Sequence, residues 1–155
     1  MLRISRLTDY GTMILVHLAG RGGKLCSASD VAAGTHVALP TVQKVLKLLT
    51  RSGLVVSARG AEGGYCLGRP ATEITAANIL DVLDGPVAIT ECSHEDSQCE
   101  LEALCQVGGA WQKINRAIRS ALDDISLADL ARPARELPVA GLTQGITRTL
   151  VRYGR

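Results

Sequence analysis

Hydrophobic residues recur three or four positions apart in several stretches of the chain, which predicts a mainly helical protein. The first stretch, residues 7–18, predicts a helix with Thr8 as its N-cap, which the run of glycines after residue 19 should end. Either Ser27 or Ser29 should then cap a short second helix that Gly34 breaks. Two helices are therefore expected in the first 35 residues.

Pro40 opens a third predicted helix that runs to Ser52, because proline is favoured in the first turn of a helix. Its apolar side consists of Val42, Val45, Leu46 and Leu49. Its other side carries hydroxyl, amide and cationic groups: Thr41, Gln43, Lys44, Lys47, Thr50 and Arg51. A short helix, a tight turn and such a helix are the layout of a helix-turn-helix that reads DNA. Many helix pairs that bind no DNA share this pattern, so periodicity alone leaves both interpretations open.

The pattern after the third helix changes to one typical of strands. Residues 53–59 and 65–69 each predict a strand, and the glycine-rich segment 60–64 predicts the turn between them. A hairpin directly after a recognition helix is a wing, which favours the DNA-binding interpretation. Arg59 at its root has the charge to enter a minor groove and read its width. A purely structural hairpin would have the same sequence pattern.

Two further helices are expected. Thr75 should cap a helix that ends at Gly85-Pro86 and turns Ile79, Leu80, Val82 and Leu83 inward. From about Gly109 a long helix carries a narrow apolar stripe made of Trp111, Ile114, Ile118, Leu122 and Ile125. Such a stripe predicts a helix–helix seam, and in a small domain with an appended helix this seam usually forms a dimer. Packing against its own domain would require the same pattern.

These elements predict a mainly α fold with one small β-hairpin. We expect a winged helix-turn-helix domain over residues 1–84, a cysteine-containing cluster-binding loop over 85–108, and a dimerisation helix over 109–131. Residues 132–155, rich in proline, glycine and arginine, are expected to form a flexible basic tail.

Three of the five cysteines, Cys92, Cys99 and Cys105, lie within fourteen residues. Thiolates are ligands for iron-sulfur clusters, zinc or copper(I). The intervals of six and five residues are wider than in the paired cysteines of structural zinc sites, which favours an iron-sulfur cluster. Four acidic residues and His94 in the same segment make packed, reduced thiols a poorer interpretation. Cys26 and Cys66 lie outside it and are interpreted as packed small side chains.

Composition and charge narrow the class of protein. There is no Phe and only one Trp, so the core must be aliphatic. Residues 1–70 carry nine Lys and Arg against three acids, residues 71–131 three against eleven, and residues 132–155 five against one. The basic N-terminal half is where a polyanion would bind. No signal peptide, membrane span or catalytic motif is present, so we expect a cytoplasmic protein that is no enzyme and has no membrane partner.

With the wing and the cysteines both located, the chain resembles winged-helix iron-sulfur transcriptional regulators of the IscR and NsrR type, the Rrf2 family. The resemblance runs from Leu2 to about Leu130 and is strongest in residues 6–10, 46–53 and 59–65 and in the three cysteines. Within the family it is greatest to the regulators of SUF cluster-assembly genes. It implies a homodimer with one cluster per subunit, long helices crossed at the centre, and winged domains on a palindromic operator.

The resemblance also bears on the cluster ligands. In IscR a histidine follows the third cysteine by three residues, whereas this chain has Gly108 there, with no side chain to donate. NsrR-like members use an acidic residue from the first helix of the other subunit, and Asp9 stands at the matching position. His94 is the local alternative, and the cluster type stays open between two and four irons. The implied ligands are Cys92, Cys99, Cys105 and Asp9.

We therefore expect a regulator of cluster-assembly genes that senses iron-sulfur supply or redox or nitric-oxide stress. The residues expected to bind double-stranded DNA are Thr41, Gln43, Lys44, Lys47, Arg51 and Arg59. The alternative from another class is a zinc-stabilised or redox-responsive module that binds protein instead of DNA.

Overall fold

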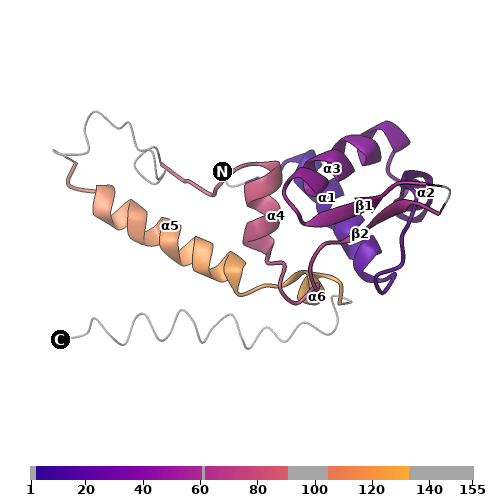
Figure 1. The fold of residues 1–155 in the computed structure, drawn as a ribbon. Helices are drawn as coiled ribbons and strands as arrows, with labels where there is room; N and C mark the ends of the chain where they lie inside the picture. The colour runs from indigo at the N-terminus through magenta and orange to yellow at the C-terminus, as the bar shows by residue number, and fades with distance from the viewer. Residues whose placement is uncertain (1–2, 61, 91–104, 133–155) are drawn as a thin grey trace.

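The computed structural model describes residues 3–60, 62–90 and 105–132 (Figure 1). They form helices α1 (Arg6–Ala19), α2 (Ala28–Thr35) and α3 (Leu39–Arg51), strands β1 (Val55–Ala58) and β2 (Gly64–Leu67), and helices α4 (Ala76–Leu83), α5 (Gly108–Asp123) and α6 (Leu127–Leu130). The prediction of a mainly α fold with a small antiparallel hairpin is confirmed. Figure 1 shows α5 extending away from the body formed by the other elements.

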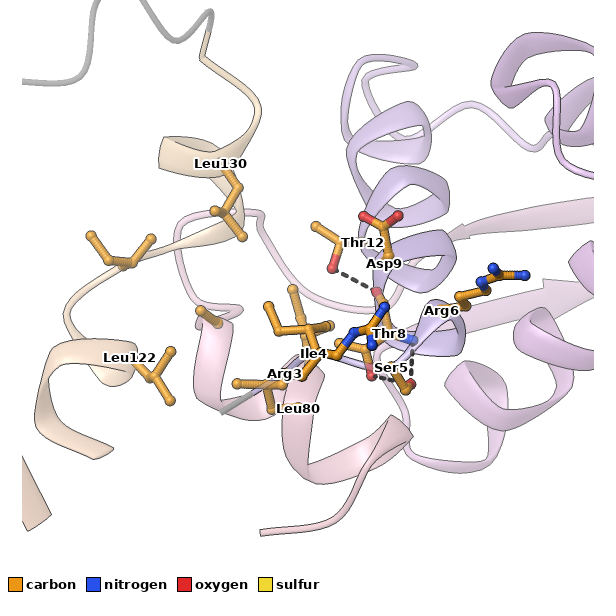
Figure 2. A pocket seen from close by; sticks show the side chains of 13 residues that line it. Arg3, Ile4, Ser5, Arg6, Thr8, Asp9, Thr12, Leu80, Leu122 and Leu130 are labelled. Carbon is orange, nitrogen blue, oxygen red and sulfur yellow. Dashed lines mark hydrogen bonds between the residues drawn. The ribbon is translucent and has the colours of Figure 1, made fainter. Parts of the chain in front are cut away.

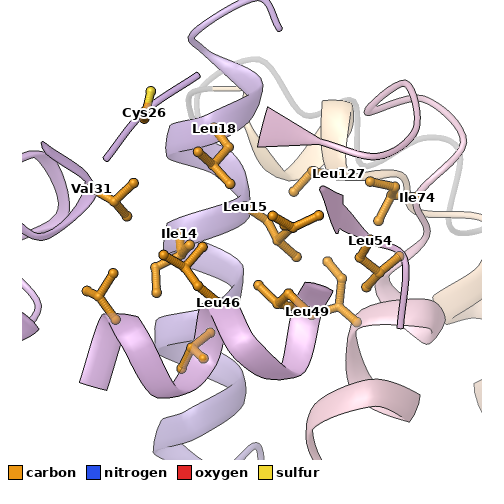
Figure 3. Packing of buried hydrophobic residues seen from close by; sticks show 14 of the residues in the cluster. Ile14, Leu15, Leu18, Cys26, Val31, Leu46, Leu49, Leu54, Ile74 and Leu127 are labelled. Carbon is orange, nitrogen blue, oxygen red and sulfur yellow. The ribbon is translucent and has the colours of Figure 1, made fainter. Parts of the chain in front are cut away.

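Helix α1 lies at the centre of the hydrophobic core (Figure 3). Its Ile14, Leu15 and Leu18 are at most 1% exposed and pack against residues from α2, α3, α4, β1 and α6. Those partners are almost all aliphatic: Val31, Val42, Val45, Leu46, Leu49, Leu54, Val55, Ile79 and Leu127. The aliphatic core expected from a chain without Phe is therefore what the structure contains.

Helix α1 begins three residues earlier than a cap at Thr8 would allow. Ser5 is the N-cap, because its hydroxyl accepts a hydrogen bond from the Thr8 backbone N–H at 3.1 Å. Thr8 is only 2% exposed and lies inside the first turn, so its prediction as the cap is wrong. At the other end Gly20 is the C-cap, as the glycine run predicted.

Helix α2 is capped by Ser27, whose hydroxyl accepts from the Asp30 N–H while the Asp30 carboxylate accepts from the Ser27 N–H. The prediction that Gly34 breaks this helix is wrong, since the helix continues to Thr35. Gly34 instead allows α1 and α2 to approach closely, because a Cβ at this position would overlap the His17 ring. The packing of α1 against α2 therefore requires a residue without a side chain at position 34.

The wing is an antiparallel pair in which Val55 faces Leu67 and Ala58 faces Gly64. Strand β1 is shorter than the predicted 53–59, and β2 begins one residue earlier than predicted and ends at Leu67. The far edge of β2 is held by a bridge in which Cys26 and Tyr65 exchange backbone hydrogen bonds of 3.0 and 2.8 Å. The hairpin is thus tied to the segment between α1 and α2.

Thr75 caps α4 as predicted, and its side chain accepts from the Asn78 N–H at 3.2 Å. Of the four side chains predicted to turn inward, Ile79 is buried, while Leu80, Val82 and Leu83 are half-buried. Asp84, at the C-terminal end of α4, accepts from the Ser5 N–H at 3.2 Å. Burial opposes ionisation of Asp84, but hydrogen bonds from Ser5 and Thr8 outweigh it and hold the pKa of the carboxyl below its usual value.

The long helix ends earlier than the predicted 131. Helix α5 stops at Asp123, because Ser126 caps a separate helix, α6, with Asp129 completing a reciprocal hydrogen-bonded pair. Ile125 therefore does not continue the α5 stripe. The chain turns back instead: Ser126 bridges to Thr75, and Leu127 is fully buried in the core around α1. Residues beyond the predicted 1–84 domain thus complete its packing.

An ion pair joins α5 to the body of the fold. The Arg119 guanidinium contacts both carboxylate oxygens of Asp81 on α4, at 2.6 and 2.8 Å, and Asp123 at 3.3 Å. The hydrogen bond to Asp81 raises the pKa of Arg119 above its usual value, so the guanidinium stays charged. Among the described helices, none is long and apolar enough to cross a lipid bilayer.

Candidate DNA interface and metal site

The polar face of α3 is open to solvent. Gln43, Lys44, Lys47 and Arg51 are exposed and Thr41 is half-buried. The four residues of the apolar side named above are 0% exposed. Within the described parts of the chain, no ion pair involves Lys44, Lys47 or Arg51. Their charges are therefore available to phosphate groups, which supply most of the affinity of DNA-binding proteins.

A turn of three residues, 36–38, joins α2 to α3. His36 adopts a left-handed conformation, with φ of 57°, and Val37 is buried, which anchors the turn.

Hydrogen bonds from the Ser27 hydroxyl and N–H hold the pKa of Asp30, on α2, below its usual value. Burial against α2, and next the charge of Arg21, lower the pKa of His17. A neutral His17 therefore fits the α1–α2 contact.

Arg59 directly follows β1 and is exposed at the turn of the wing, so its expected position at the root of the hairpin is wrong. Gly60 after it has φ of 116°, a conformation that side-chain-bearing residues rarely adopt. Arg59 has no ion pair with any residue that the structure describes. Among the described residues, the structure thus carries a cation without an ion pair at the wing and three on α3, the arrangement that winged helices use on DNA.

Of the predicted metal ligands, Cys105 and Asp9 lie within the described residues, whereas Cys92, Cys99 and His94 lie outside them. Cys105 is exposed and its thiol is free. A Cβ at Gly108 would lie 3.5 Å from Cys105 Sγ, so position 108 adjoins this sulfur. A side chain there could reach a metal beside Cys105, and glycine supplies none. Cys26 is buried and Cys66 half-buried, as packed residues.

Asp9 is exposed in the first turn of α1 and lines a cavity of about 750 Å³ (Figure 2). The cavity lies between α1, α4, the C-terminal end of α5 and α6. Its apolar wall includes Ile4, Ile79, Leu80, Leu122, Ile125 and Leu130. Sequence patterns gave no sign of this cavity, because its wall combines four segments that are far apart along the chain.

Asp9 and Cys105 of one chain lie at opposite ends of α5. Asp9 shares its cavity with Leu122 near the end of the helix, while Cys105 precedes its first residue, Gly108. A helix of 16 residues is about 24 Å long at 1.5 Å per residue. Within the described part of a single chain, no three His, Cys, Asp or Glu side chains come together to hold a metal ion. A shared site would need two chains.

Comparison with known proteins finds relatives that match most of the chain. The sequence pattern of the Rrf2 family, described as an iron-dependent transcriptional regulator, matches residues 4–133. The chain is 33% identical over 135 residues to protein aau3 of Rhizobium meliloti. This alignment covers 85% of the chain and 88% of that protein. Both alignments include the helix-turn-helix, the wing and α5.

Two solved structures have the same fold. CymR of B. subtilis, described as the global cysteine regulator, has a TM-score of 0.66 and 33% identity, with coverage of 84% of this chain and 97% of that one. IscR of T. potens has a TM-score of 0.62 and 28% identity, with coverage of 83% and 85%. The similarity thus extends over most of each chain.

Proposed function

Because the chain belongs to the Rrf2 family and is a DNA-binding transcriptional regulator rather than an enzyme, we propose that an iron-sulfur cluster controls its operator binding. The proposed target genes encode the SUF cluster-assembly system, and the proposed signal is iron-sulfur supply or oxidative or nitrosative stress. Family membership favours this over the protein-interaction module. The observation that carries the proposal is the exposed Cys105 thiol beside Gly108, with Asp9 at the opposite end of α5.

DNA is bound through α3 and the wing. Lys44, Lys47 and Arg51 on α3 and Arg59 on the wing contact phosphates or the minor groove, while Thr41 and Gln43, near the start of α3, contact base edges. Rrf2 regulators are typically dimeric, and a two-fold dimer presents two such units to a palindromic operator. The separation of the two α3 helices then sets the spacing of the half-sites.

The salt dependence of operator binding tests this interface. Lys44→Ala and Arg59→Ala should each weaken binding and reduce the log–log salt slope by about one unit, because each removes one phosphate contact. Arg116→Ala, an exposed cation on α5, is the matched control and should change neither quantity. Wild-type affinity at every salt concentration for both the Lys44 and the Arg59 variant would rule the interface out.

The ligands proposed for the cluster are Cys92, Cys99 and Cys105 of one subunit and Asp9 of the other. A cluster held this way would supply sensitivity to oxygen and nitric oxide, since a carboxylate is a weaker ligand to iron in a sulfide cluster than a thiolate is. The exposed thiol of Cys105 and the exposed carboxylate of Asp9 suit such a donor set. Gly108 leaves the fourth position to another side chain.

A homodimer offers the geometry that Asp9 needs. If two α5 helices cross near their middles in opposite directions, the Cys105 end of one helix lies beside the Leu122 end of the other. Asp9 of that second chain lines the cavity at its Leu122 end. The carboxylate that is remote from Cys105 within one chain would then be close to the Cys105 of its partner.

Visible absorption of anaerobically purified protein tests the ligands. Cys105→Ala should abolish the cluster chromophore, and Cys66→Ala should retain it. Asp9→Asn keeps the size of the side chain but loses the charge, so it should speed cluster loss in air, whereas Asp9→Cys should slow it. An unchanged spectrum and decay in Asp9→Asn would exclude Asp9 and make His94 or an external molecule the candidate ligand.

The relative CymR supports a second candidate. It is described as a cysteine regulator and matches this chain at 33% identity. Control by a cysteine-related signal without a cluster would therefore also fit the family. A colourless wild-type protein that binds its operator normally would favour this second function.

A further inference from the structure

The cavity beside Asp9 and the exposed side chain of Trp111 are two apolar features of the described residues. Trp111, the only tryptophan of the chain, lies on α5 and is 41% exposed, and Ile114 next to it is 44% exposed. The apolar part of the cavity wall includes Ile4, Leu80, Leu122 and Leu130. We propose that Trp111 of a second copy of the chain seats in this cavity. The inference rests on the proposed homodimer and specifies its interface.

Trp111 and the cavity-lining residue Leu122 lie on the same face of α5. Leu122 lies eleven positions after Trp111, and at 3.6 residues per turn this brings the two within about 20° of each other around the helix axis. They are about 16 Å apart along the axis. Leu122 lines the cavity, so the exposed stripe that begins at Trp111 runs continuously into the cavity wall.

A two-fold axis between these two positions gives both copies the same contact. With α5 helices crossing antiparallel midway between residues 111 and 122, Trp111 of each chain lies opposite Leu122 of the other. Isologous interfaces have this property, so two tryptophans would fill two cavities at once. No additional partner is needed to cover either feature.

The chemistry of the cavity suits an indole. A tryptophan is a large side chain and buries roughly 150–250 Å² of surface in an interface. The cavity, with a volume of about 750 Å³, has room for the indole and for part of the neighbouring stripe. Arg3 also lines the cavity, and a guanidinium can stack on the face of an indole. Tryptophan and arginine are the residues most often found at the energetic centre of protein interfaces.

Tryptophan fluorescence of the full-length protein tests this seat, since the emission comes from one residue. In the dimer the emission should be blue-shifted and protected from an aqueous quencher, and dilution to the monomer should reverse both. Ile4→Glu places a charge in the cavity at a residue that is already 61% exposed, so it should not unfold the chain. It should weaken dimerisation about tenfold or more and shift the Trp111 emission to the red.

The matched control is Val56→Glu, at an exposed apolar residue of the wing, which should change neither dimerisation nor emission. A stable dimer whose emission stays that of an exposed indole would overturn the inference while leaving the homodimer intact. A chain that is monomeric at all concentrations would overturn the homodimer as well. Operator affinity and the visible spectrum, measured on the same samples, separate these outcomes from failure of DNA or cluster binding.

Discussion

Helices α3 and α5 have the same amphipathic sequence pattern and different surroundings. The apolar stripe of α3, Val42, Val45, Leu46 and Leu49, is completely buried within its own chain. In α5 two stripe residues, Trp111 and Ile114, remain more than 40% exposed, and of the sixteen residues only Gly108 is buried. Periodicity therefore identifies which face of a helix is apolar, and the fold decides whether the same chain covers it.

This difference assigns the two helices different tasks. Helix α3 uses its apolar face to hold its place in the fold, which leaves its polar face free for DNA. Helix α5 is held near its C-terminal end by Arg119 and by the turn into α6, and its N-terminal half keeps an open apolar face. Substitutions on the two stripes should accordingly affect different equilibria.

The largest effect is expected in α3. Leu46→Ala should lower the free energy of unfolding by about 2–5 kcal/mol, because it leaves a cavity at a residue that is 0% exposed. Urea unfolding monitored by circular dichroism measures the loss. Lys47→Ala, next to it on the exposed face, should change stability by about 0.5 kcal/mol or less. If Leu46→Ala lowered the free energy of unfolding only slightly, the apolar stripe of α3 would not contribute to the core as proposed.

On α5 a comparable change should act on association. Ile114→Glu should weaken the dimer by about tenfold or more, since it puts a charge at the centre of the exposed stripe. Sedimentation over a range of concentrations measures the dissociation constant. Unfolding of the separated monomers should be unaltered, because Ile114 is 44% exposed in one chain. If Ile114→Glu destabilised the monomer as much as Leu46→Ala, the distinction between the two stripes would fail.

A smaller effect is expected at the link between α5 and the rest of the chain. The Arg119 guanidinium contacts both carboxylate oxygens of Asp81. The two side chains are 36% and 30% exposed, so solvent screens the attraction. A double-mutant cycle with Arg119→Ala and Asp81→Ala should yield a coupling of about 0.5–1 kcal/mol. Zero coupling would show that this ion pair does not help to hold α5 against α4.

The smallest effect concerns the capping carboxylates. Hydrogen bonds from Ser126 hold the pKa of Asp129 below its usual value of 3.8, as those from Ser27 do for Asp30. A lowered pKa means that the unfolded chain binds protons first, so stability is full above pH 3.8 and falls as acid protonates the folded carboxylates. Asp129→Asn should flatten the acid limb of a plot of stability against pH. An unchanged acid limb would exclude Asp129 as a contributor.

Local chemistry made much of the fold predictable from sequence. The α3 stripe, the Thr75 cap and the turn of the wing follow from residue types within a few positions, and the structure has them. Ser5 and Thr8 are both good caps three residues apart, and the sequence pattern favoured the wrong one. The Ser5 N–H also donates to Asp84, a residue distant along the chain, and the local pattern around Ser5 does not show this contact.

Long-range packing limited the rest. Nothing near Gly34 in sequence shows that the His17 ring lies against it, so it was interpreted as a helix breaker. The burial of Leu127 and the cavity beside Asp9 also depend on segments that are distant along the chain. The DNA-contacting side chains and the cluster ligands stay predictions, although the exposure of α3, Arg59 and Cys105 supports them.

The position of Leu127 determines when the hydrophobic core can be completed while the chain is being synthesised. It lies in the core around α1, yet it follows α5 in sequence. Since chains leave the ribosome from the N-terminus, the winged-helix core cannot close until α6 has been made. A nascent chain that stops before Ser126 would expose the surface that Leu127 covers, and proteases could recognise it there. Every chain that completes its DNA-binding fold therefore already carries the helix with which we expect it to pair.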